Sequence, residues 1–238
     1  MLIGKDFDKI EWDFFGWHLL EPNAFIGDVI ILSIALYLAY KIHKLQLKTP
    51  FFYYWKWFFI IFGIGFFMGG IGHVMYNYLG LPGKYFSWYS GIVASFLVEK
   101  AMISIYPNAS WRTFLTKIAL GKMVVALVVA TIVYTTVDLT TDQSKALLVP
   151  TINSIVGLGL TLGVLGFYYS KRINSCFNYL WLSTLILIPS AFLQSLKINF
   201  HQWFDRNDAS HILLITSLIL YYICIKNFAK SINSEKVI

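Results

Sequence analysis

Long runs of apolar residues recur along the chain, and short polar breaks separate them. A helix that crosses a bilayer needs about 20 mostly apolar residues, and the polar–apolar alternation of a barrel strand is absent. The pattern therefore predicts an all-α, polytopic membrane protein built as a bundle of seven transmembrane helices. The predicted spans cover residues 24–42, 55–76, 86–106, 114–137, 146–169, 177–196 and 208–228.

These spans leave little chain outside the membrane. Residues 1–23 are predicted to form an acidic, amphipathic segment, residues 24–229 one seven-helix membrane domain, and residues 230–238 a cytoplasmic tail. The first segment lacks the basic-then-apolar order of a secretory signal, so we expect it to be retained. In the fifth span, Gly159 and Gly163 predict a small-residue face on which another helix packs closely.

Basic residues follow the odd-numbered spans, as Lys41 and Lys44 follow the first and Lys171 and Arg172 the fifth. Because such residues are retained in the cytoplasm, we predict an N-terminus outside the cytoplasm and a C-terminus within it. The composition, 58% hydrophobic and 13% charged, also favours a membrane protein. Anionic lipid explains the net charge of +7, so we expect membrane lipids as partners and no nucleic acid.

Ionisable side chains inside a span are unfavourable in lipid, so each one is a candidate for function. Most of the candidates fall at the predicted outer ends of the first, second and seventh spans. They are Glu21, Asn23, Asp28, His73, His201, Asn207, Asp208 and His211. The polar residues thus predict a site on one side of the bundle.

Imidazoles and carboxylates on facing helices suit a divalent metal such as zinc. We predict His73, His211 and Asp208 as ligands, with His201 as a further one; Asp208 is also the candidate catalytic carboxylate. A metal-bound water would attack a carbonyl group, which is the chemistry of hydrolysis. The alternative is structural: Asn207 or Asp208 caps the seventh span, and His211 is hydrogen-bonded to a neighbouring helix.

Two charged residues fall deeper in the predicted bundle. Glu99 in the third span stands beside Lys100, and an ion pair or a snorkelling arrangement explains it better than catalysis. Lys122 in the fourth span is expected to snorkel or to find a polar partner inside the bundle.

Short motifs near the two ends of the chain resemble those of a known family. EW at residues 11–12 precedes GWHLLEPNAFIGDVI, His73 lies in GGIGHVMYNYLG, and His211 lies in RNDASHILL. In order and spacing these motifs are similar to the alkaline ceramidases and the wider CREST superfamily of seven-helix membrane hydrolases, which includes the progestin and adiponectin receptors. The chain differs at Asn207 and Gly69, where that family carries His and Ser.

The resemblance implies a zinc ion held by His73 and His211 in a seven-helix bundle. It also implies a calcium ion bound beside the zinc by the acidic N-terminal segment, where Glu11, Asp13 and Glu21 would supply oxygen ligands. The implied activity is hydrolysis of a lipid amide or ester, as in a ceramidase.

Two main functions remain open from the sequence. In the first, the protein is a membrane-embedded, metal-dependent hydrolase that acts on a lipid. In the second, it is a non-enzymatic seven-helix receptor or lipid-binding protein, in which the same polar cluster binds a ligand or only locks the helices together. A transporter ranks third, because the sequence has no inverted repeat.

Overall fold

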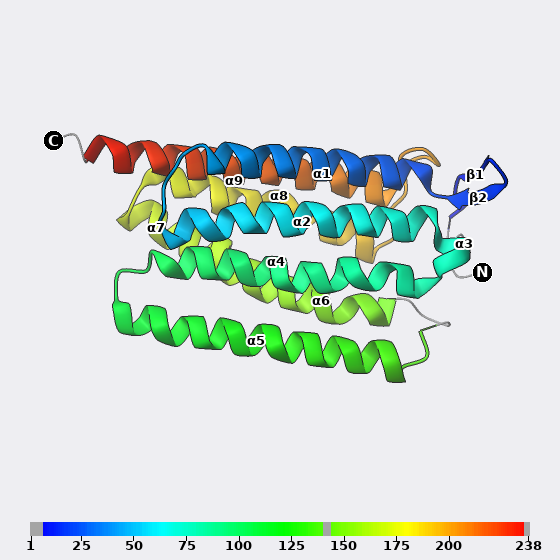
Figure 1. Cartoon of the computed structure of the whole chain (residues 1–238), viewed down its shortest axis with the longest axis horizontal. Helices are drawn as coiled ribbons and strands as arrows, with labels where there is room; N and C mark the ends of the chain where they lie inside the picture. The colour runs from blue at the N-terminus through cyan, green and yellow to red at the C-terminus, as the bar shows by residue number, and fades with distance from the viewer. Residues whose placement is uncertain (1–6, 140–143, 236–238) are drawn as a thin grey trace.

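A small two-stranded hairpin lies at one end of a bundle of long helices in the structure, a computed structural model (Figure 1). The structure describes residues 7–139 and 144–235, so residues 1–6 of the predicted N-terminal segment and residues 236–238 of the predicted tail lie outside it. The hairpin joins β1 (Glu11–Phe14) to β2 (Trp17–Leu20) and was not predicted.

The helices follow one another with short connections. In chain order they are α1 (Pro22–His43), α2 (Pro50–Val74), α3 (Tyr76–Leu79), η1 (Leu81–Lys84), α4 (Tyr85–Ser104), α5 (Ala109–Thr136), α6 (Ser144–Leu158), η2 (Gly159–Leu165), α7 (Gly166–Arg172), η3 (Ser175–Phe177), α8 (Asn178–Ser195) and α9 (Arg206–Glu235). η2 is π-helical and follows α6 without a break, so it forms a π-helical stretch inside one long helix.

Among the described residues, six helical segments are long and apolar enough to cross a membrane. They are Pro22–His43, Pro50–Val74, Ala109–Thr136, Lys145–Arg172, Ser175–Ser195 and Arg206–Ser234. The protein is therefore a multi-pass helical membrane protein. α4, which is 20 residues long, packs against α2, α5 and α6 within the same bundle but is not one of these six.

Local sequence sets several helix starts. Pro22 and Pro50 lie in the first turns of α1 and α2, where proline's fixed φ suits a helix and its missing N–H is not needed. α2 therefore begins before the predicted residue 55. The side chain of Asn108 caps α5 by accepting the backbone N–H of Trp111 at 3.0 Å. At the other end of the chain, α9 continues to Glu235, past the predicted end at residue 228.

The core consists of large apolar side chains buried between the helices. Trp55, Phe59 and Tyr221 are fully enclosed between α2 and α9, and α1 contacts both of these helices. Val125 and Ile132 on α5, in contrast, are exposed. Apolar side chains on the outside of an edge helix are what a lipid environment favours.

Candidate functional site

Most of the predicted polar residues come together at one end of the bundle, which we call the hairpin end. Here β2 finishes, α1 and α9 begin and α2 ends (Figure 1). β2 leads into α1 through Glu21, whose φ of 49° and ψ of 51° are left-handed. Few residues other than glycine adopt this conformation. The backbone N–H of Glu21 donates a hydrogen bond to the Ile10 carbonyl at 2.9 Å. This turn starts α1 while the Glu21 carboxylate stays buried.

A network of charged side chains surrounds the Glu21 carboxylate. Its Oε1 lies 2.7 Å from Lys9 Nζ, and its Oε2 lies 2.5 Å from His73 Nδ1. Lys9 Nζ also lies 2.6 Å from Asp205 Oδ2, and Lys84 Nζ lies 3.4 Å from His73 Nδ1. The Lys9 ammonium therefore connects the start of α1 to the residue that precedes α9.

Electrostatics keeps two members of this network, Glu21 and Lys9, charged. Burial alone would raise the pKa of the Glu21 carboxyl, but the imidazole and the two ammonium groups beside it hold that pKa well below its usual range. Burial opposes the charge of Lys9, yet Glu21 and Asp205 raise the pKa of its ammonium above the usual value. For Lys84 burial dominates and lowers the pKa of the ammonium. Glu21 and Lys9 are thus ionised at neutral pH.

His73 is the part of the network that can meet a ligand. Its Nδ1 is fixed by the Glu21 carboxylate, which assigns the ring proton to Nδ1. Its Nε2 makes no hydrogen bond to any residue that the structure describes, and the side chain is 22% exposed, although its carboxylate partner is buried. The ring therefore offers one free nitrogen that can accept a hydrogen bond or a proton.

Asp205 and Asp208 together cap the start of α9. Its Oδ2 accepts the backbone N–H of Asp205 at 2.9 Å, and Asp205 Oδ1 accepts the backbone N–H of Asn207 at 2.7 Å. These two carboxylates form a capping box, with Asp205 rather than Asn207 or Asp208 at the cap position. Asp208 Oδ2 also accepts a hydrogen bond from the Asn23 side chain at 2.7 Å, which joins α9 to the first turn of α1.

A second carboxylate–imidazole pair lies further into the bundle. Asp28 Oδ1 on α1 is 3.3 Å from His211 Nε2 on α9, and both side chains are largely buried. A Cβ atom at Gly27 would collide with His211 Nδ1, and one at Gly70 would lie 2.9 Å from the Asp28 Cβ. His211 Nδ1 is buried without a hydrogen-bond partner among the described residues. Glycine at these two positions lets the pair fit between α1, α2 and α9.

Four predicted site residues lie apart from this network. Asn207 Oδ1 accepts a hydrogen bond from Gln194 of α8 at 3.1 Å. His201 is exposed in the connection between α8 and α9, where it accepts a backbone N–H. Glu11 and Asp13 are exposed on β1, where Asp13 pairs with a histidine across the hairpin. The calcium prediction grouped them with Glu21, but the buried Glu21 carboxylate has Lys9 and His73 as its described partners instead.

The predicted metal ligands have different partners and do not converge on one point. They are His73, His201, Asp208 and His211. In the described part of the chain, no group of three or more His, Cys, Asp or Glu side chains could hold a metal ion. The ammonium groups of Lys9 and Lys84 lie among the carboxylates and would repel a divalent cation. This arrangement does not fit the implied zinc and calcium sites, and metal binding stays a prediction.

Sequence reasoning missed three members of the network: Lys9, Lys84 and Asp205. The spacing of the two aspartates in DRND at residues 205–208 is that of a capping box and could have identified the start of α9. Lys84 is a single charge in the apolar stretch YLGLPGKYF. Nothing local distinguishes Lys9 from the other charged residues of its segment.

A second buried polar cluster joins α4, α5 and α6. Lys122 Nζ lies 2.7 Å from Glu99 Oε1 and 2.6 Å from Asn153 Oδ1. Lys122 thus has polar partners inside the bundle, which confirms one of the two alternatives for it. The partner of Glu99 is Lys122 rather than Lys100, because the Lys100 ammonium lies over the ring of Tyr54, 5.2 Å from its centroid. Glu99 thus forms an ion pair, one of the two arrangements expected for it, and its partner lies on the next helix rather than beside it in sequence.

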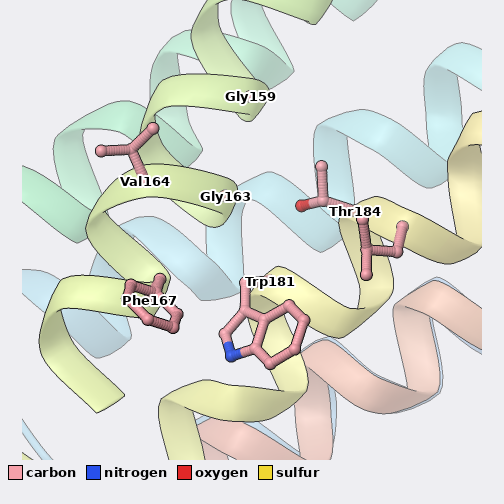
Figure 2. Close-up of a pocket in the computed structure, with 7 residues that line it drawn as sticks. Gly159, Gly163, Val164, Phe167, Trp181 and Thr184 are labelled. Carbon is pink, nitrogen blue, oxygen red and sulfur yellow. The ribbon is translucent and has the colours of Figure 1, made fainter. Parts of the chain in front are cut away.

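An open apolar groove of about 400 Å³ lies between η2 and α8 (Figure 2). Gly159, Gly163 and Phe167 line one side, and Trp181 and Thr184 line the other. A Cβ atom at Gly159 would meet nothing within 4 Å, so no described helix fills this part of the predicted small-residue face. None of the residues that line the groove is charged, which separates it from the polar network.

Comparison with known proteins gives a family but no function. A family described as "Family of unknown function (DUF6962)" matches residues 24–230. No curated protein and no solved structure matches the chain. The matched region begins within the first turn of α1 and ends within α9, so it leaves out Lys9 and Glu21. Because the match covers most of the chain, the protein belongs to the DUF6962 family of unknown function.

Proposed function

We propose that the chain crosses the membrane seven times, with α4 as one of the crossings and the hairpin end outside the cytoplasm. α2 ends and α4 begins at the hairpin end, whereas α4 ends and α5 begins at the opposite end (Figure 1). A chain that leaves the membrane on one face and re-enters from the other must cross it between the two points. The basic residues at the opposite end support the orientation.

Two variants, each with one introduced cysteine, test this topology. His18→Cys lies on the hairpin and Ser110→Cys at the start of α5, both at exposed positions, whereas the native Cys176 and Cys224 are buried. A membrane-impermeant maleimide should label His18→Cys in intact cells and Ser110→Cys only after permeabilisation. Labelling of both variants in intact cells would refute the crossing by α4, and the reverse pattern would refute the orientation.

For the activity, we infer a non-enzymatic seven-helix protein that binds the polar group of a membrane lipid at the hairpin end. The observation that carries this proposal is the state of His73, whose Nδ1 is held by Glu21 while Nε2 has no described partner. The Lys84 ammonium stands beside the same ring. Together they offer a hydrogen-bond acceptor and a cation at the level where helices end and lipid headgroups begin.

A lipid that carries both a donor and an acceptor near its headgroup fits these two groups best. A hydroxyl or amide N–H would donate to His73 Nε2, and an amide, ester or phosphate oxygen would accept from Lys84. The other carboxylates already have partners: Asp205 and Asp208 bond to backbone N–H groups and to Lys9 or Asn23. They support the site by fixing α1 against α9.

Hydrolysis of a lipid amide or ester is the competing candidate, and His73 also favours it. An imidazole whose Nδ1 is held by a carboxylate is oriented as metal ligands and general bases are. The Lys9 ammonium and the Lys84 side chain lie beside the same carboxylate–imidazole pair, and they argue against a divalent cation there. The ligand-binding proposal therefore accounts for more of the arrangement.

Purification from membranes tests both candidates in one sample. We expect the wild-type protein to retain lipid detectable by native mass spectrometry and to contain no stoichiometric metal. His73→Ala should lose the lipid, whereas His18→Ala, at an exposed histidine on the hairpin, should keep it. A wild-type protein that is folded and free of lipid would refute the proposal. Stoichiometric zinc that is lost in both His73→Ala and His211→Ala would favour the hydrolase.

A further inference from the structure

The hairpin that precedes α1 has two chemically different faces. Residues that lie directly opposite each other in an antiparallel pair share a face, and here Trp12 pairs with Leu19 and Phe14 with Trp17. One face therefore consists of three aromatic side chains and a leucine, which we call the aromatic face. The alternate positions place Glu11, Asp13, His18 and Leu20 on the other face, where Leu20 is buried and Asp13 contacts His18.

The aromatic face is largely uncovered by the described chain. Trp12 is 53% exposed, Phe14 47% and Trp17 50%, and Phe15 at the turn is 89% exposed. Trp12 and Phe14 contact each other with ring centroids 5.4 Å apart, so they form one continuous apolar surface. A soluble surface rarely presents such a patch without a partner.

Contacts with α3 fix the hairpin at the end of the bundle and extend its aromatic face. The Trp17 ring packs edge-on against Tyr78 at 4.9 Å, and the Tyr78 hydroxyl accepts the backbone N–H of His18 at 2.9 Å. The Asn77 side chain donates to the His18 carbonyl at 3.1 Å. Tyr78 and its neighbour Leu79 are themselves exposed, so the patch continues onto the helical domain.

We propose that the aromatic face of the hairpin binds the lipid surface of the membrane that the helices cross. The hairpin lies where α1 and α9 begin and α2 ends, which is the depth at which a bundle of spanning helices meets the headgroups (Figure 1). Tryptophan and tyrosine are enriched at this depth because their rings are apolar on one side and polar on the other. The exposed residues of the other face, Glu11, Asp13 and His18, then point to water.

This inference goes beyond the ligand proposed for His73 and does not depend on it. The lipid surface binds the aromatic face of the hairpin. The base of the hairpin is held to the bundle by the ion pairs of Lys9 and by the backbone hydrogen bond of Glu21. The two contacts together position the segment that carries Lys9. By binding lipid, the hairpin thus helps to hold Lys9 in its place beside Glu21 and Asp205.

Site-specific fluorescence in proteoliposomes of the full-length protein tests the lipid contact of the hairpin. Asp13→Cys and Phe14→Cys are adjacent positions on opposite faces, and each is labelled with an environment-sensitive NBD probe. The probe at residue 14 should show blue-shifted emission, quenching by doxyl-labelled phosphatidylcholine and little quenching by iodide. The probe at residue 13 should show the reverse. Phe15→Cys gives the same test at an 89% exposed position, where the packing lost is an edge-on contact with the Phe14 ring.

Two results would overturn the proposal. Equal iodide quenching at residues 13, 14 and 15 would place both faces in water. Protection of residues 14 and 15 from iodide without quenching by doxyl lipid would mean that a second copy of the chain covers the aromatic face. Lipid that still quenches residue 14 in a His73→Ala background would support the lipid contact of the hairpin even where the proposed ligand site has failed.

Discussion

Replacing Lys9 with methionine should destabilise the protein more than removing any one charge from the exposed connections between helices. The ammonium lies 2.7 Å from Glu21 and 2.6 Å from Asp205, and both carboxylates are almost fully buried. Removing one partner of a buried ion pair costs about 3–5 kcal/mol. Glu21 keeps His73 as a partner, so we expect about 3 kcal/mol, the lower end of that range. At about 2–4 °C per kcal/mol for a chain of this size, Tm should fall by about 6–12 °C.

The two native cysteines provide the assay. Cys176 and Cys224 are buried, so a thiol-reactive dye that fluoresces on reaction reports unfolding of the detergent-purified protein during a temperature ramp. Lys48→Met is the matched control, because Lys48 is exposed in the connection between α1 and α2. Its effect should be within about 0.5 kcal/mol, as for most surface substitutions.

A double variant separates lost charge pairing from lost packing. Asparagine is a good helix cap, so Asp205→Asn keeps the start of α9 while removing the charge that Lys9 neutralises. The variant with both Lys9→Met and Asp205→Asn should therefore recover part of the lost Tm. Equal Tm values for Lys9→Met and Lys48→Met, or no recovery in the double variant, would refute the role given to the Lys9 ammonium.

Three further predictions use the same melting assay. Gly27→Val should destabilise the protein by about 1–3 kcal/mol, because its Cβ collides with the buried His211 imidazole. Gly121→Val is the control, because its Cβ meets nothing within 4 Å. Similar losses of stability in the two variants would contradict this packing. Because the pKa of Glu21 is lowered on folding, its contribution is present above its unfolded-state pKa of about 4.3 and is lost as pH falls through the folded-state value. Wild-type Tm should thus drop more between pH 6 and pH 3 than Tm of Glu21→Gln, and parallel curves would argue against it. Lys122→Met should lower the free energy of unfolding by about 3 kcal/mol, because it leaves Glu99 unpaired. Adding Glu99→Gln should restore much of that stability. A double variant no more stable than Lys122→Met would contradict the pairing.

The helices could be predicted because lipid requires long, continuous apolar runs, and these are visible without knowledge of the fold. Their ends were less predictable. α2 begins at Pro50 rather than at the predicted residue 55, because proline is favoured in the first turn of a helix. The hairpin was missed because its strands are only four residues long and carry charges, although left-handed Phe15 and Gly16 at its turn are typical of a tight hairpin.

The candidate site could be predicted in part for a related reason. Asp28, His73 and His211 were recognisable because ionisable residues are rare in apolar runs. The partners of these residues were not, since pairing depends on which helices touch. His73 meets Glu21 across 52 residues of sequence, and Lys9 meets Asp205 across 196. No local pattern encodes such contacts, so the ammonium groups of Lys9 and Lys84 could not be placed beside these residues from the sequence.

The contact between Lys9 and Asp205 also bears on the order in which the protein is made. Lys9 and Glu21 leave the ribosome early and can pair as soon as the first helix is inserted, but Asp205 follows 196 residues after Lys9. The second half of the ion pair therefore forms only when the last helix enters the membrane beside the first. Until then the Lys9 ammonium has one partner. The contact with Asp205 forms last, when α9 packs beside α1. Loss of this contact should therefore first impair assembly during synthesis: the last helix would insert into the membrane but fail to pack against the first.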